Sequence, residues 1–140
     1  MSLSNNANPY EPRRMLDDLK PGARLRSAKA VVLTGALWAI AWSFPLAGFL
    51  ALVFRFPVPL AGIVSGPDGV IPAMFAVAIY GIFLGGFVVI AVTGALSGIL
   101  LRAVAPDSKY FQVLQIVAAA VAACIPLFVL ATLDMWIGAW

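Results

Sequence analysis

The sequence contains no histidine, and its 140 residues include a single cysteine, Cys124. One cysteine cannot form a disulfide within the chain, and the usual metal and haem sites depend on imidazoles or on clusters of cysteines. We therefore expect no cofactor and no bound metal.

Charged residues are also scarce, at 11% of the chain, whereas hydrophobic residues make up 63%. This balance lies far from that of a soluble domain. Three runs without a charged residue, 30–54, 70–101 and 111–133, are each long enough at 1.5 Å per residue to cross a hydrocarbon core of about 30 Å. The sequence therefore predicts an all-α membrane protein with three transmembrane helices, at about 30–54, 72–101 and 111–133, in a domain of residues 30–140.

The absence of charge within these runs argues against several functions. A charge at the middle of a bilayer costs at least about 2.5–3.5 kcal/mol and is kept where it functions, as in ion-coupled transporters, voltage sensors and intramembrane hydrolases. We therefore expect no enzymatic activity. The serine and threonine hydroxyls within the spans are expected to bond to carbonyls of their own helix. Gln112 and Gln115 open the third span, where they are expected to be hydrated, unless a deeper position lets them bond to another helix.

The basic residues predict an orientation. Six of them precede the first span, one follows it, two lie between the second and third spans, and none lies beyond the third. Basic residues favour the cytoplasmic side of a membrane, so the alternating counts predict an inside N-terminus and an outside C-terminus.

The first 29 residues form a polar, basic leader that we expect to be disordered. Its last cations, Arg24, Arg26 and Lys29, are expected to contact anionic lipid headgroups, and the net charge of +3 is interpreted as a signal for location, without a nucleic-acid partner. The segment Asn8–Pro12 resembles the Asn-Pro-Tyr-x-Pro leader of small multi-pass bacterial inner-membrane proteins of unknown function. That resemblance implies a bacterial inner membrane and supplies no site residues.

Five of the twelve glycines lie in residues 81–98 of the second run. As one helix, that run of 32 residues would be about 48 Å long and would have to protrude, bend or break, with Gly85-Gly86 as the bend. Gly81 with Gly85 and Gly94 with Gly98 also form two GxxxG pairs, which allow close helix contact. Two interpretations stay open: the pairs contact the first and third spans, or one pair faces another chain.

Small and bulky side chains occupy opposite faces of the first span. Ala36, Ser43 and Ala47 form a small face that is suited to close helix packing. The opposite bulky face is interpreted either as lipid contact or as a groove for a hydrophobic ligand or partner helix, and it contains Trp38, Trp42 and Phe49. The Trp42 indole would lie deep and would need a hydrogen-bond acceptor. Pro45 and Pro126 predict kinks in the first and third spans.

The outer connection, residues 56–69, is expected to rest on the bilayer surface or, as an alternative, to re-enter it. Together these features indicate a non-enzymatic accessory or structural membrane subunit that packs in a homo-oligomer or a larger complex. Its expected partners are lipids and other transmembrane helices. The alternative is an oligomeric pore or carrier for a neutral or apolar solute.

Overall fold

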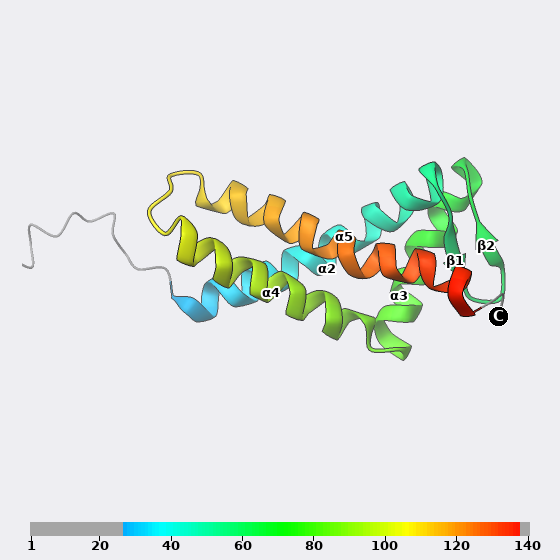
Figure 1. Cartoon of the computed structure of the whole chain (residues 1–140), viewed down its shortest axis with the longest axis horizontal. Helices are drawn as coiled ribbons and strands as arrows, with labels where there is room; N and C mark the ends of the chain where they lie inside the picture. Colours follow the sequence, from blue (N-terminus) through cyan, green and yellow to red (C-terminus); the bar gives the residue numbers. More distant parts are fainter. Residues whose placement is uncertain (1–26, 138–140) are drawn as a thin grey trace, which may run out of the picture.

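The computed structural model describes residues 27–137, with side chains as far as residue 133. Its elements are almost all helical (Figure 1). In chain order they are α2 (Ala28–Val53), β1 (Phe56–Val58), β2 (Gly62–Val64), a 3₁₀ turn (Pro67–Gly69), α3 (Val70–Phe83), α4 (Gly86–Val104) and α5 (Phe111–Ile137).

Three helices are long and apolar enough to cross a membrane: Ala28–Val53, Gly86–Val104 and the Phe111–Leu133 part of α5. All three expose many large aliphatic and aromatic side chains along the described part of the chain. Such a surface is costly in water and ordinary in lipid. The prediction of a mostly helical protein with three membrane-length helices is confirmed, and its orientation across a membrane stays a prediction.

The second apolar run is two helices rather than the single span predicted at 72–101. Gly85 separates α3 from α4 and has a φ of +69°, a left-handed conformation that glycine adopts without steric cost. The break expected at Gly85-Gly86 is therefore confirmed. Only α4, with 19 residues and about 28 Å of helix, has the length to cross a membrane.

The three long helices run lengthwise, and α3 lies with the hairpin at one end (Figure 1). The start of α2 and the connection from α4 to α5 lie together at the opposite end. Lys29, Arg102 and Lys109, which belong to those segments, therefore share one end, whereas Arg55 follows α2 at the other. This arrangement matches the alternating sides on which the basic residues were counted.

The outer connection is an ordered hairpin rather than an irregular loop. β1 and β2 pair antiparallel, with Phe56 opposite Val64. The Phe56 side chain is fully buried in a cluster with Ala47, Ala76 and Leu127, so it closes this end of the helix bundle. The Gly66 N–H donates to the carbonyl of Ala51 at 2.8 Å and ties the hairpin back to α2.

Both internal prolines leave their helices continuous. Pro45 lies within α2 and Pro126 within α5. Each lacks the N–H that would bond to the carbonyl four residues earlier, which weakens the helix without ending it here. The predicted kinks stay predictions.

Candidate helix-docking site

Helices α2 and α4 make a close contact at which two glycines face each other. A Cβ added at Gly35 would lie 2.4 Å from the carbonyl oxygen of Gly94. A Cβ added at Gly94 would lie 2.4 Å from the Cβ of Ala39 and 2.5 Å from the carbonyl oxygen of Gly35. Neither position has room for any side chain, so the two backbones are in direct contact.

A glutamine from α5 joins this contact. The Gln115 Nε2 donates to the carbonyl of Val31 at 2.7 Å, and Gln115 is only 4% exposed. A Cβ at Gly98 would lie 3.0 Å from the same Val31 carbonyl oxygen and 3.4 Å from Gln115 Nε2. Of the two alternatives for this residue, the structure shows the interhelical bond, whereas Gln112 is exposed. We call Gly35, Gly94, Gly98, Val31 and Gln115 the glycine junction.

The hydroxyl groups of the spans bond locally, as predicted. Ser43 donates to the carbonyl of Ile40, Thr93 to that of Ile90 and Ser97 to that of Gly94, at 2.6, 2.9 and 2.8 Å. Thr34 donates to Ala30, and Thr132 to Phe128 and Val129. These hydroxyls therefore have partners within their own helices and do not require a ligand.

The pair Gly81 and Gly85 has a different environment from Gly94 and Gly98. A Cβ at Gly81 would lie 2.5 Å from the ring of Phe87, so the chain's own first turn of α4 occupies that side. Gly85 has no neighbour within 4 Å of a Cβ position and serves as the hinge. In contrast, Gly94 and Gly98 are buried and contact the first span.

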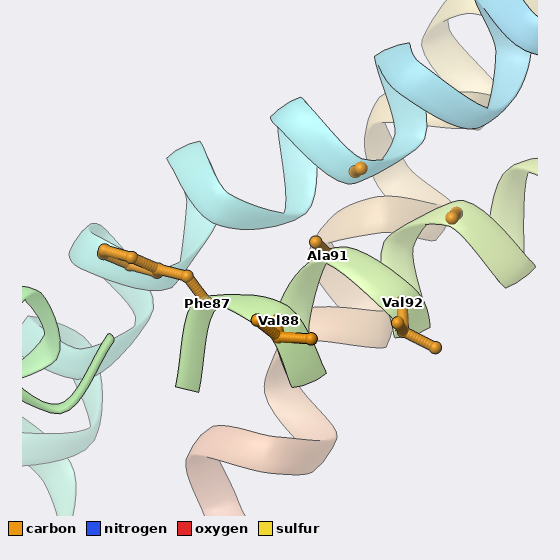
Figure 2. Close-up of a pocket in the computed structure, with 6 residues that line it drawn as sticks. Phe87, Val88, Ala91 and Val92 are labelled. Carbon is orange, nitrogen blue, oxygen red and sulfur yellow. The ribbon is translucent and has the colours of Figure 1, made fainter. Parts of the chain in front are cut away.

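A shallow apolar groove lies on the surface of the protein between α2 and α4, and we call it the seam groove. It measures about 420 Å³ and is lined by Ala36, Phe87, Val88, Ala91, Val92 and Ala95. Figure 2 shows Phe87 directed toward α2, whereas Val88 and Val92 point away from it and are exposed. Three alanines on two neighbouring helices form the floor, so another helix could approach both backbones closely.

The predicted small face of α2 divides between two environments. Ser43 and Ala47 are fully buried inside the chain. Ala36 is only partly buried and lines the seam groove. Of these three residues, Ala36 is therefore the one available to a partner.

The bulky face of α2 lies apart from the seam groove. Trp38 and Phe49 are exposed, at 39% and 58%. Trp42 is partly buried, and its indole N–H has no acceptor within the described part of the chain, although a buried donor normally has one. The exposed side chains fit the lipid-contact interpretation better than the ligand-groove interpretation.

The residues predicted to contact lipid headgroups are only partly described. Lys29 is exposed in the first turn of α2. Arg24 and Arg26 lie outside the described residues.

A second and deeper groove lies between α3, α4 and α5, and we call it the outer groove. It measures about 410 Å³. Its lining comes from the end of α3, the hinge, the first two turns of α4, and residues 125–133 of α5. Thr93 is one of its few polar residues. The groove has no signature in the sequence, because it is created by the break at Gly85, which turns α3 away from the line of α4 (Figure 1).

Neither groove contains a set of catalytic or metal-binding groups. Within residues 27–133, no cluster of three or more histidine, cysteine, aspartate or glutamate side chains could hold a metal ion. The chain matches no known family model, no curated protein and no solved structure. Geometry and composition alone therefore support the functional assignment.

Proposed function

We propose that the protein is a small, non-enzymatic integral membrane subunit whose seam groove receives a transmembrane helix of another subunit. The observation that supports this proposal is the stripe of Ala36, Ala91 and Ala95 left open on the α2–α4 seam. The seam groove contains no polar side chain that a substrate would need for recognition.

A partner helix would bind the seam groove for the same physical reason that helices of this chain contact one another. Helices in lipid gain no hydrophobic free energy by associating, so they associate where small residues allow close van der Waals packing. The chain satisfies this requirement internally with Gly35 and Gly94. The seam alanines offer a weaker version of the same surface to the outside, as expected for assembly between folded subunits.

The runner-up function is an oligomeric pore or carrier for a neutral or apolar solute, and the outer groove is the observation that favours it. The interior of the single chain is filled by Ala39, Ile90, Ala119 and Ala123. A passage across the membrane would therefore have to form between several copies.

The experiment that tests the proposal compares leucine substitutions of two alanines, one inside the seam groove and one outside it. Ala95→Leu fills the seam groove, whereas Ala41→Leu adds the same bulk at an exposed position of α2. We expect Ala41→Leu to keep the assembly mass of the wild type in lipid nanodiscs and Ala95→Leu to dissociate to the folded single chain. If the mass of the wild-type assembly includes foreign subunits, the protein belongs to a larger complex. If it is a multiple of the mass of this chain, the protein forms a homo-oligomer. Unchanged assembly of Ala95→Leu would contradict the proposal.

We further propose a bacterial inner membrane as the location, with the N-terminus inside and with Arg24, Arg26 and Lys29 on the lipid headgroups. In a Cys124→Ala background, a cysteine at Asp68 should react with an impermeant thiol reagent in intact cells, and one at Ser108 should be protected. Reversed labelling would contradict the orientation without affecting the seam proposal.

A further inference from the structure

A leucine at the tip of the β1–β2 hairpin has an unusual backbone conformation. The Ala61 N–H donates to the carbonyl of Val58 at 3.2 Å, and Leu60, the third residue of this turn, has a φ of +67°. With Pro59 second and a positive φ third, the turn is of type II, which ordinarily has glycine at the third position. Leucine resists this left-handed conformation because of its Cβ. The hairpin therefore carries backbone strain at Leu60.

The chain has glycine at its other left-handed positions, so this leucine is an exception. Within residues 27–137, the other residues with a positive φ are Gly62, Gly66 and Gly85. Leu60 is also fully exposed, at 110%, so packing within the chain does not offset the strain. In water the exposed side chain would be a second cost, whereas hydrocarbon would accept it. A strained and fully exposed leucine indicates a contact outside the chain.

The hairpin lies where a bilayer around the three long helices would end. Its strands run across the long direction of the bundle, so the tip stays at that end of the bundle rather than projecting away from it (Figure 1). Other large apolar side chains of the same end are exposed, namely Phe54 after α2, Ile63 in β2 and Ile71 in the first turn of α3. Apolar side chains therefore face outward at the level where lipid would meet them.

Arg55, which lies between α2 and β1, adds a positive charge at this end. Its guanidinium carbon lies 5.3 Å from the centre of the Phe54 ring. Its Nε is buried and has no hydrogen-bond partner within the described chain, although a buried donor normally has one. The planar donor fork of arginine suits a phosphate. An exposed apolar tip and a cation without an acceptor together match a phospholipid, which has both a hydrocarbon chain and a phosphate.

We propose that the hairpin anchors this end of the protein in the adjacent lipid leaflet, with Leu60 in the hydrocarbon and the Arg55 guanidinium on a lipid phosphate. This anchor requires the membrane location proposed above, but it does not require a helix in the seam groove. Leucine supplies apolar surface that glycine would lack, which gives a reason for the strained residue at the tip.

Spin labels test where the tip lies relative to the bilayer. In a Cys124→Ala background, Leu60→Cys, Asp68→Cys and Val121→Cys each carry a nitroxide in vesicles of phosphatidylethanolamine and phosphatidylglycerol. Asp68 is exposed in the same connection, and Val121 is exposed on α5. We expect the labels at 60 and 121 to collide mainly with oxygen, which concentrates in hydrocarbon. Collisions with a water-soluble nickel chelate should be severalfold less frequent at 60 than at 68.

The label at 121 separates the anchor from the membrane location itself. If the label at 121 lies in lipid and the label at 60 lies in water, the anchor is overturned and the membrane location stands. If both labels lie in water, both proposals fail. A label at 60 that is shielded from oxygen and nickel alike would assign a protein partner to the tip, which also overturns the anchor.

A second measurement tests the phosphate contact without changing residue 60. We expect Arg55→Gln to lower the Tm in phospholipid nanodiscs and to leave it unchanged in a maltoside detergent, which contains no phosphate. Arg55→Lys keeps the charge and should lose less than Arg55→Gln. Equal losses of Tm in both media would show that Arg55 acts within the chain and would overturn the lipid contact. Recovery of the wild-type nanodisc Tm by inorganic phosphate in maltoside would assign a free anion instead of a lipid.

Discussion

The two halves of the apolar run from residue 70 to 101 use the same glycine spacing for different purposes. In the inner half, Gly94 and Gly98 are buried where α4 meets α2, and a Cβ at Gly94 would meet Ala39 at 2.4 Å. In the outer half, Gly81 contacts the chain's own Phe87, and Gly85 has open space beside it and a φ of +69°. Gly94 and Gly98 set the distance between α4 and α2, whereas Gly85 sets the change of direction between α3 and α4.

This difference separates two physical properties of glycine. At Gly94 the absence of a side chain matters, because it allows two backbones to touch. At Gly85 the backbone freedom matters, because other residues resist a positive φ. A spacing of four residues does not reveal whether the small size or the backbone freedom of a glycine matters. Substitutions that change only one of these two properties can distinguish them.

The largest expected effect comes from Gly94→Leu. The added side chain cannot fit between α4 and α2, so the helices must separate and the glycine junction is lost. We expect destabilisation of more than about 3 kcal/mol and little folded protein, measured by yield and by unfolding in a detergent titration. Ala95→Leu, one residue along, is the control and should stay folded. Wild-type yield and unfolding for Gly94→Leu would show that the α2–α4 contact is not as close as described.

Gly85 should show a smaller effect that depends on backbone preference. Asparagine tolerates the left-handed conformation, whereas valine does so at high cost. We expect Gly85→Val to destabilise the protein by about 1–2 kcal/mol and Gly85→Asn by less, with the same unfolding titration as the measurement. Because space beside Gly85 is open, side-chain size should not decide the ranking. Equal losses for the two variants would show that the positive φ is not the constraint.

Gln115→Leu tests the hydrogen bond between α5 and α2. The variant replaces the amide with an apolar side chain of similar size that cannot donate to Val31, so we expect a loss of about 1 kcal/mol in the free energy of unfolding. Gln112→Leu on the same helix is exposed and should change stability little. If the two variants behave alike, the Gln115 contact contributes nothing beyond packing.

The smallest effect is expected for Trp42→Phe. The buried indole N–H has no acceptor within the described chain, so removing it loses no hydrogen bond there. We expect stability within about 0.5 kcal/mol of the wild type or slightly higher. A clear loss of assembly mass with unchanged stability of the single chain would instead assign the acceptor to a partner subunit.

The sequence predicted the long helices because their signal is local. An uncharged run longer than a bilayer and a glycine pair at Gly85-Gly86 are visible without any tertiary information. The local hydrogen bonds of Ser43, Thr93 and Ser97 were predictable for the same reason, since each partner lies three residues away.

The hairpin and the two grooves could not be predicted, because they depend on contacts between distant segments. Phe56 is buried by residues from α2, α3 and α5, and nothing near it in the sequence indicates this. The environment of Gln115 likewise depends on Val31, 84 residues away. Ala36 was identified as small, but only its position beside Ala91 and Ala95 distinguishes it from the buried Ser43 and Ala47.

The central claim is that a helix of another subunit occupies the seam groove, and photo-crosslinking in the native membrane tests it most directly. A photoreactive amino acid is placed at Val92, which lines the seam groove and is exposed (Figure 2), and, as a control, at Val121, which is exposed on α5. The account predicts a protein adduct of one defined mass from Val92 and only lipid adducts from Val121. Lipid adducts alone from both positions would contradict it.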